Sequence, residues 1–347
     1  MNDDITGVRV AVTGAAGFIG SHVVDWLVAC GALVHGVDDL SGGFVENCNP
    51  RSELTLVDVR KFEEVECWLD RVQPEVVYHL AADATEGRSQ FTPISATERN
   101  YLGYINVLTS AIRHRARKIV FTSSMSVYGA QHPPFTENMP RSPVDIYGIA
   151  KAASEAATEV MSAVHGIEYT IIRPHNVYGP RQCMSDPYRN VVAIFISRAL
   201  QGQSVMIYGS GEQERAFSYI DDCAPLIAES GFRKDLNGEI LNVGSSIPCS
   251  INSLVRALEL ELGAPIVREH VPDRPREVQR AWCGHEKMHD FFTFDEGETD
   301  LEVGLRRTVG WVLDRYDGGV LLPEMTYLDH LEIENEQTPK TWTERRI

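Results

Sequence analysis

The stretch Val8-Arg-Val-Ala-Val-Thr-Gly-Ala-Ala-Gly-Phe-Ile-Gly20 decides the fold of this chain. Its first five residues form a mostly apolar run typical of a buried strand, and Gly14, Gly17 and Gly20 follow at three-residue spacing. Apolar residues then recur with a helical period, so we expect a strand, a tight turn and a helix. Glycine lets the turn approach a ligand, and the helix start offers free N–H groups, which favours a dinucleotide pyrophosphate. Glycine turns also connect elements without binding anything, and the flanking strand and helix are what favour a site here.

The composition restricts the classes of protein to which this chain can belong. The chain has 347 residues, 43% of them hydrophobic, and a formal net charge of −17. The negative charge argues against a nucleic-acid partner or an anionic membrane surface. Seven widely spaced cysteines without a Cys-x-x-Cys pair predict core thiols and no metal site. The polar N-terminus lacks a signal peptide and no apolar run is long enough for a membrane span, so we expect a soluble cytoplasmic protein.

Strand patterns alternate with helical patterns in the first half of the chain. After the first strand, further strands are expected at 32–37, 54–57, 75–80, 118–122 and 168–172, with helices at 62–72, 94–114 and 147–165. This alternation predicts a doubly wound parallel Rossmann sheet of the α/β class, with helices on both faces. Ligands bind beyond the carboxyl ends of such strands, where the glycines, Asp38 and Ser124 all fall.

The character of the chain changes near residue 173, where short strands and helices cease to alternate regularly. We therefore predict a dinucleotide-binding domain over 1–173, which later segments rejoin, and a smaller α/β substrate lobe over 174–335. Residues 336–347 are expected to form a polar, mobile tail.

Asp38 ends the second expected strand, about 20 residues beyond the glycines, the position where an acidic side chain binds a ribose diol. The same charge would repel a 2′-phosphate, which favours NAD over NADP. The alternative is a solvated acid in a turn, and the glycine turn favours the binding role.

Tyr147 and Lys151 lie four residues apart and so share one face of a helix. An adjacent ammonium and a cationic nicotinamide would both favour the phenolate, which makes Tyr147 a candidate general base. Ser124 can hydrogen-bond the same substrate hydroxyl. A Tyr-x-x-x-Lys pair alone is common on solvated helix faces, and its place behind a dinucleotide turn favours the catalytic interpretation.

Together these features resemble the extended short-chain dehydrogenases/reductases, specifically the nucleotide-sugar epimerases and dehydratases. The resemblance spans roughly residues 8–313. It is carried by Thr13-Gly-Ala-Ala-Gly-Phe-Ile-Gly20, His79-Leu-Ala-Ala82, Thr122-Ser-Ser-Met-Ser-Val-Tyr-Gly129, Tyr147-Gly-Ile-Ala-Lys151, Arg173-Pro-His-Asn-Val-Tyr-Gly-Pro180 and Arg215-Ala-Phe-Ser-Tyr-Ile-Asp-Asp222. It implies a tightly held NAD and a nucleoside-diphosphate sugar in the C-terminal lobe.

The resemblance also assigns roles to matching positions. The catalytic set is Ser124, Tyr147 and Lys151. The cofactor set is Gly14, Gly17, Phe18, Ile19, Asp38, Asp58, Val59, Leu80, Ala81, Ala82, Asn100, Tyr147 and Lys151. The substrate set is Ser124, Met125, Asn176, Asn190, Tyr208, Arg215 and Arg274, in which the arginines suit a diphosphate and Tyr208 a nucleobase.

The two residues after Ser124 distinguish between the reactions of this family. Sugar dehydratases carry Asp-Glu there and decarboxylases usually a glutamate in this segment, whereas this chain has Met125 and Ser126. The minimal set that remains predicts an NAD-dependent isomerase, a 4-epimerase acting through a transient 4-keto sugar. The substrate would be of the UDP-glucose/galactose type, with N-acetylated and uronate sugars kept open.

Two alternative functions are kept open, and two residues differ from the family's pattern. Another 4-keto-dependent enzyme (a dehydratase or a 3,5-epimerase) and a non-catalytic dinucleotide sensor are the alternatives. Arg276 replaces the family's usual glycine, as a contact to an acidic sugar or as a surface residue. Ala281 replaces a bulkier gate residue and could leave room for an N-acetyl or carboxyl group. The resemblance further implies a homodimer formed through helices 94–114 and 147–165.

Overall fold

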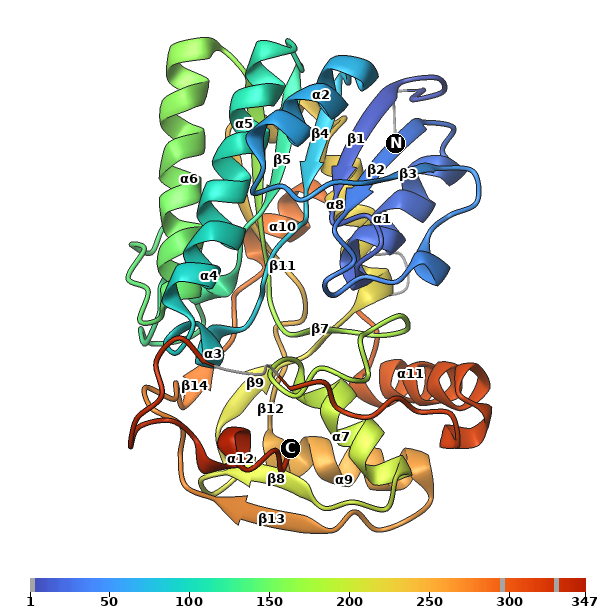
Figure 1. Cartoon of the computed structure of the whole chain (residues 1–347), viewed down its shortest axis with the longest axis vertical. Coiled ribbons are helices and arrows are strands. Elements are labelled where there is room, and N and C mark those ends of the chain that lie inside the picture. Colours follow the sequence, from blue (N-terminus) through green and yellow to red (C-terminus); the bar gives the residue numbers. More distant parts are fainter. Residues whose placement is uncertain (1–3, 294–296, 328–330) are drawn as a thin grey trace.

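The computed structural model describes residues 4–293, 297–327 and 331–347. At its centre lies a seven-stranded parallel sheet in the order β3–β2–β1–β4–β5–β6–β11 (Figure 1). The strands are β1 (Arg9–Thr13), β2 (Leu33–Asp38), β3 (Glu53–Leu56), β4 (Val76–His79), β5 (Lys118–Thr122), β6 (Glu168–Pro174) and β11 (Glu239–Val243). The predicted doubly wound α/β fold is confirmed.

Helices cover both faces of this sheet. They are α1 (Phe18–Ala29) and α8 (Ile220–Ser230) on one face, and α2 (Phe62–Val72), α5 (Gly103–Arg113) and α6 (Ile146–His165) on the other. Successive residues of a strand point to opposite sides. Val10 and Val12 of β1 therefore pack with α1 and α8, while Ala11 packs with α2 and α5.

The chain leaves the sheet after β6 and returns to it with β11. Glu239 pairs with Thr170 and Val243 with Pro174 in parallel register. No strand is predicted at 239–243 from the sequence, although later segments are expected to rejoin this domain. The strand is short, and its residue Asn242 is polar but fully buried, which breaks the apolar run that would have revealed it.

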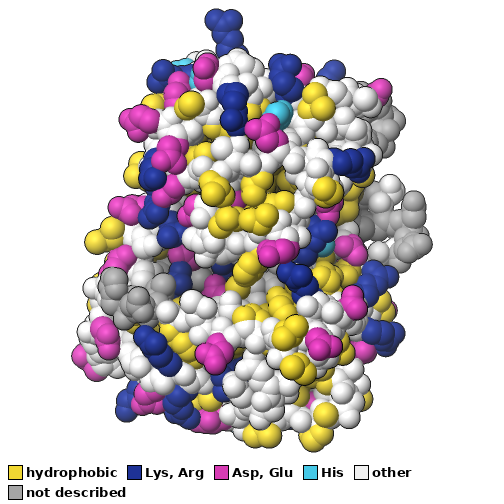
Figure 2. Space-filling view, turned by 45° about the vertical axis from the view of Figure 1, so that its right-hand side comes forward, with side chains coloured by type: hydrophobic (Ala, Val, Ile, Leu, Met, Phe, Trp, Pro, Cys, Tyr) yellow, Lys and Arg dark blue, Asp and Glu magenta, His cyan; other side chains and the backbone are white. Residues whose placement is uncertain are grey.

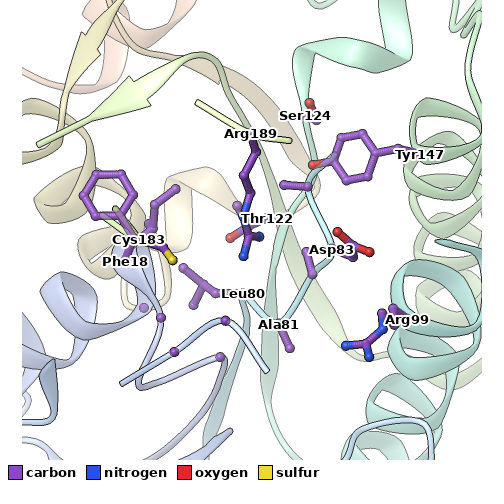
Figure 3. A pocket seen from close by; sticks show the side chains of 18 of the residues that line it. Phe18, Leu80, Ala81, Asp83, Arg99, Thr122, Ser124, Tyr147, Cys183 and Arg189 are labelled. Carbon is purple, nitrogen blue, oxygen red and sulfur yellow. The ribbon is translucent and has the colours of Figure 1, made fainter. Parts of the chain in front are cut away.

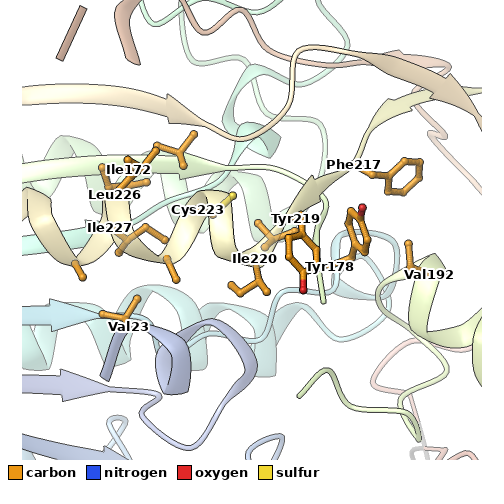
Figure 4. Close-up of a cluster of buried hydrophobic side chains, with 14 of the residues drawn as sticks. Val23, Ile172, Tyr178, Val192, Phe217, Tyr219, Ile220, Cys223, Leu226 and Ile227 are labelled. Carbon is orange, nitrogen blue, oxygen red and sulfur yellow. The ribbon is translucent and has the colours of Figure 1, made fainter. Parts of the chain in front are cut away.

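The second lobe is built from short elements below the sheet in Figure 1. They are β7 (Val177–Tyr178), α7 (Val191–Leu200), β8 (Val205–Tyr208), β9 (Glu214–Ala216), β10 (Ser218–Tyr219), β12 (Pro248–Ser250), α9 (Ile251–Leu262), β13 (Arg268–Val271), β14 (Arg280–Ala281) and α11 (Leu301–Arg315). Helix α10 (Glu286–Phe291) lies instead beside β11, where Lys287 Nζ donates to the Ile240 carbonyl. One hydrophobic cluster continues from Val23 on α1, past Ile227 on α8, to Val192 on α7 (Figure 4). The two lobes therefore share a core.

The expected helix at 94–114 is present but interrupted. It consists of α4 (Pro93–Thr97), one π-helical turn (Glu98–Leu102) and α5. The wider turn holds Asn100, which is fully buried. Such π-turns within α-helices occur often at functional sites, where they turn a side chain inward.

Residues 336–347, expected from the sequence to form a polar, mobile tail, include a short helix and a buried side chain. Residues 340–343 form a short helix, α12 (Lys340–Thr343), and Trp342 is 5% exposed. Its ring packs edge-on against Phe91 and Tyr188, and the Thr341 hydroxyl lies 2.7 Å from the Tyr208 hydroxyl. A few apolar residues in a polar segment are enough to anchor it, because each buries a large area.

The seven cysteines are free thiols, but the expectation that most are core residues is wrong. Only Cys223 and Cys283 are buried, and Cys67 is exposed. Within the described ranges, none of the helices has the length and apolar character needed to cross a bilayer.

A buried carboxylate joins α6 to the sheet. Glu155 Oε1 and Oε2 accept hydrogen bonds from Arg173 Nε at 2.8 Å and Nη2 at 2.6 Å, and both side chains are at most 1% exposed. Ser123, at the end of β5, and Arg141 donate to the same carboxylate. Burial alone would raise the pKa of Glu155, but Arg173 and Ser123 outweigh it and hold the pKa below its ordinary value.

We expect Glu155→Ala to lower the free energy of unfolding by about 3–5 kcal/mol, because Arg173 would stay buried without a counter-charge. Urea denaturation of the variant and the parent measures the loss. Since the pKa of Glu155 is depressed, its contribution is present above the ordinary glutamate pKa and is lost as the pH falls through the depressed value. Glu64→Ala, which breaks an exposed pair with Lys61, is the control, and equal losses in the two variants would contradict the prediction.

Candidate active site

The glycine turn between β1 and α1 is shaped for close approach. Gly14 has φ +70°, and a Cβ added there would lie 2.7 Å from the Ala81 nitrogen. A Cβ on Gly20 would lie 1.9 Å from the Gly14 carbonyl oxygen, so the turn closes only without side chains. α1 begins after Gly17 without a side-chain cap, which leaves its first N–H groups available to an anion.

Asp38 stands at the end of β2 and faces this turn. Its Oδ2 accepts from Ala16 N at 3.0 Å and its Oδ1 from Leu40 N at 2.9 Å. Burial raises the pKa of Asp38, and these backbone N–H groups oppose the rise. A carboxylate held in this way suits a ribose diol.

A cavity of about 470 Å³ opens beyond the carboxyl ends of the strands. Of the residues predicted from the sequence, it brings together Gly14, Gly17, Phe18, Ile19, Asp38, Asp58, Val59, Leu80, Ala81, Ala82, Ser124, Met125, Tyr147, Lys151, Asn176 and Asn190. The uncapped helix start, the close-packed glycines and the acceptor at Asp38 together fit a dinucleotide, with its pyrophosphate at the turn.

The predicted catalytic side chains lie together at one end of this cavity. Figure 3 shows Tyr147 and Ser124 on the side opposite Phe18 and Cys183. Lys151 Nζ donates to the Thr122 carbonyl at 2.7 Å and lies 5.7 Å from the centre of the Tyr147 ring. Tyr147, Ser124 and Lys151 are 4%, 6% and 1% exposed, so all three side chains are largely shielded from water.

At this end of the cavity, burial shifts the pKa of Tyr147 in the direction opposite to that expected from the sequence. It raises the pKa of Tyr147 well above its ordinary value, Glu86 adds to the rise, and a hydrogen bond with Ser124 opposes it. Burial also lowers the pKa of Lys151 to about 7, against the attraction of Glu155. From the sequence we expect the ammonium to help lower the pKa of Tyr147, and in the protein alone desolvation of both groups outweighs that effect.

Four other predicted residues lie outside the cavity lining. Asn100 is buried and holds the backbone of Asp83 through its side-chain amide, with Asp83 N 2.9 Å from Oδ1. Tyr208 lies under the guanidinium of Arg274, whose Cζ is 4.8 Å from the ring centre. Arg215 completes the set, on β9.

Glu277 engages both arginines of the predicted diphosphate site. Arg215 Nη2 is 3.0 Å from Glu277 Oε1, and Arg274 Nε is 2.8 Å from Oε2. Glu277 is not among the residues predicted from the sequence, because its role depends on segments that meet only in the folded lobe.

Asn176 and Asn190 take backbone conformations unusual for residues other than glycine, with φ +42° and +58°. Asn176 Nδ2 donates to the Ala216 carbonyl, and Asn190 Nδ2 donates to the Val177 carbonyl. Asn190 Oδ1 also accepts from Val192 N and so caps α7. Both side chains are thereby fixed at the cavity wall.

The two departures from the family pattern also lie away from the cavity lining. Arg276 is exposed in a turn with φ +60°, in agreement with the surface interpretation. Ala281 is buried with Tyr128, Phe135 and Cys283 in a small cluster and is not among the residues that line the cavity.

The comparisons with known proteins agree with this geometry. Residues 10–244 match the model of the NAD dependent epimerase/dehydratase family. The chain belongs to this family. It is 33% identical to a UDP-glucose 4-epimerase of Mycolicibacterium smegmatis, over 87% of this chain and 97% of that protein.

Other members show how the family varies. The structure resembles the UDP-glucose 4-epimerase of Thermotoga maritima solved with UDP-glucose, with a TM-score of 0.81, 33% identity and coverage of 88% of this chain and 99% of that one. A UDP-glucuronate 4-epimerase of Thermodesulfobacterium geofontis is 31% identical over 86% of this chain and 94% of its own length. Fold and family are therefore shown, whereas the sugar differs among relatives.

Several charged residues of this cavity are not predicted from the sequence, and two of them, Glu86 and Arg189, adjoin the proposed ligand sites. Glu86 lines the cavity and accepts from Ser126 Oγ at 3.0 Å. Arg189 reaches from the substrate lobe across to the loop after β2, since a Cβ on Gly42 would lie 2.5 Å from its Nη2. Asp186 pairs with Arg189 Nε at 2.7 Å. Neither Glu86 nor Arg189 stands in a motif, and only the fold brings each to the site.

We expect Gly20→Ala to weaken NAD binding by about tenfold or more, since the added methyl would push against the Gly14 carbonyl and open the turn. Bound NAD, released by denaturation and quantified, measures the loss. Gly310→Ala, on α11 with open space around it, is the matched control and should keep its NAD. Retention of NAD by both variants would argue against the turn as the pyrophosphate site.

Proposed function

We propose that this protein is an NAD-dependent 4-epimerase of a nucleoside-diphosphate sugar, most simply a UDP-linked hexose. The observation that carries the proposal is the meeting of Ser124, Tyr147 and Lys151 beside a dinucleotide turn. Met125 and Ser126, directly after Ser124, offer no acid for removing a hydroxyl as water. The 4-epimerases among the relatives support the same reaction.

The residues proposed to bind the cofactor would lie around its pyrophosphate, its adenosine ribose and its adenine. The turn Gly14–Gly17 would receive the pyrophosphate and Asp38 the adenosine ribose, with Asp58 and Val59 beside the adenine. Arg189 would approach the pyrophosphate from the opposite lobe, as a second source of positive charge. When bound, NAD would supply a reversible hydride acceptor, so the reaction would need no outside oxidant.

In the proposed mechanism, side chains of this protein transfer the proton of the sugar's C4 hydroxyl. Tyr147 removes the proton from the C4 hydroxyl of the sugar, and Ser124 holds that oxygen by a hydrogen bond. Lys151 stands behind the phenol and stabilises its ionised form. Burial opposes ionisation of Tyr147, and the positive charge of a bound nicotinamide would favour the phenolate.

The substrate lobe is proposed to grip the nucleotide. Arg215 and Arg274 offer planar guanidinium groups to the diphosphate, and Tyr208 offers a ring to the base. Asn176 and Asn190, fixed in the wall, can donate or accept beside the phosphates. This grip leaves the sugar able to turn over in its 4-keto form, so that hydride returns to the other face.

We expect Tyr147→Phe to reduce turnover of UDP-glucose by about 10³-fold or more, since the base is lost while the cavity keeps its shape. NAD content should be unchanged. NMR of the sugar anomeric signals follows turnover, and Tyr316→Phe, at the end of α11, is the control. Full activity in Tyr147→Phe would reject the mechanism, and solvent deuterium in the product would instead favour a dehydratase or 3,5-epimerase route.

We also propose a homodimer built on α6 and the neighbouring α4–α5 segment. Apolar side chains lie exposed along these helices: Ile94 at 65%, Leu102 at 45%, Ile149 at 49%, Val160 at 60% and Val164 at 68%. On the face shown in Figure 2, acidic and basic side chains are interspersed. A row of exposed apolar residues on helices is the usual mark of a partner surface.

We expect Val160→Asp to convert the dimer into a monomer, because two carboxylates would be buried in a symmetric interface. Light scattering coupled to gel filtration measures the mass. Leu260→Asp changes a still more exposed apolar residue, at 79%, on α9 of the other lobe and should leave the mass unchanged. A monomeric parent protein would refute the proposed dimer.

A further inference from the structure

Glu86 is a carboxylate at the end of the cavity that holds the catalytic groups. It opens the short helix α3 (Glu86–Ser89) and lines the cavity together with Met125 and Tyr147. Ser126 Oγ donates to its Oε1 at 3.0 Å. Ser126 lies two residues beyond Ser124, so the Glu86 carboxylate adjoins the place proposed for the sugar ring.

Within the described residues, Glu86 forms no ion pair. The arginines that line the cavity differ from it in this respect. Each arginine in the lining has a carboxylate partner: Arg60 with Asp58, Arg88 with Asp83, Arg99 with Asp39 and Arg189 with Asp186. Arg215 and Arg274, which face Glu86 from the substrate lobe, are joined to Glu277. Each of these arginines already has a carboxylate partner, and in the part of the chain that the structure describes none of them forms a salt bridge with Glu86.

The negative charge of Glu86 contributes to the raised pKa values of two neighbouring side chains. After burial, Glu86 is the largest contribution that raises the pKa of Tyr147. It also adds to burial in raising the pKa of Asp145 to about 7, against the hydrogen bond that Asp145 Oδ1 accepts from Gly148 N at 2.7 Å. The sugar end of the cavity is thus acidic and rich in acceptors.

We propose that Glu86 determines which sugar this enzyme accepts: it binds a hydroxyl of an uncharged hexose and excludes sugars that carry a carboxylate. This inference rests on the proposed function and narrows it, since the sequence leaves both neutral sugars and uronates open. A carboxylate accepts hydrogen bonds and cannot donate them. A hydroxyl supplies the donor that Glu86 lacks, whereas a uronate would add a second negative charge beside it.

The test measures binding on Tyr147→Phe protein loaded with NAD, so that turnover does not blur the dissociation constants. Calorimetric titration with UDP-glucose and with UDP-glucuronate gives the ratio of the two constants. We expect UDP-glucose to bind about 30-fold more tightly than UDP-glucuronate. Adding Glu86→Gln should bring the ratio to within about threefold, since the amide is neutral and can donate to a carboxylate.

A matched variant separates this effect from a general change of charge in the cavity. Asp39→Asn removes one negative charge from the cofactor end of the same cavity, where Asp39 pairs with Arg99. It should leave the ratio for the two sugars near that of the parent. A parent ratio near one, or a ratio that Glu86→Gln leaves unchanged, would overturn the inference.

Turnover by the unmodified enzyme separates the two proposals. Epimerisation of UDP-glucose together with a ratio near one would sustain the proposed function and refute the role of Glu86. Loss of all UDP-glucose turnover in Glu86→Gln, with unchanged binding, would assign Glu86 to the chemistry and also refute selection. Absence of epimerisation and of binding by both sugars would overturn the function and, with it, the inference.

Discussion

The buried ion pair between Glu155 and Arg173 is the constraint on which the site depends. Tyr147, Lys151 and Glu155 recur every four residues and lie on one face of α6. Glu155 anchors that face to Arg173 on β6 and to Ser123 at the end of β5. One buried carboxylate thus holds the helix that carries Tyr147 and Lys151 against the strand end that presents Ser124.

Such a pair adds less to stability than its geometry suggests, because removing two charges from water offsets most of their attraction. In this protein, the main effect of the pair is to fix the position of α6 against the sheet. Arg173 also donates to the Tyr128 hydroxyl, which in turn donates to Asn242 on β11. The network therefore connects the returning seventh strand to α6, and the catalytic groups are held by both halves of the chain.

Burial opposes ionisation at the end of the cavity that holds Tyr147 and Lys151. In the protein alone, burial disfavours the charged forms of both Tyr147 and Lys151. Glu86 adds a negative charge at the same end, which keeps the phenol protonated. In the proposed mechanism, a bound cation would favour the phenolate of Tyr147 and oppose this effect of burial.

Local patterns in the sequence were sufficient for the turn and for the Tyr-x-x-x-Lys face, because both depend on residues a few positions apart. The strands and most helices were predictable from periodicity for the same reason. By contrast, Glu86 meets Ser126 across 40 residues, Glu155 meets Arg173 across 18, and Thr341 meets Tyr208 across 133. The spacing of residues along the chain carries no information about such contacts, which exist only after the sheet and the lobe have packed together. Chemistry that is local in sequence was therefore readable directly, whereas the charge around the sugar and the anchoring of the tail were decided by tertiary structure alone.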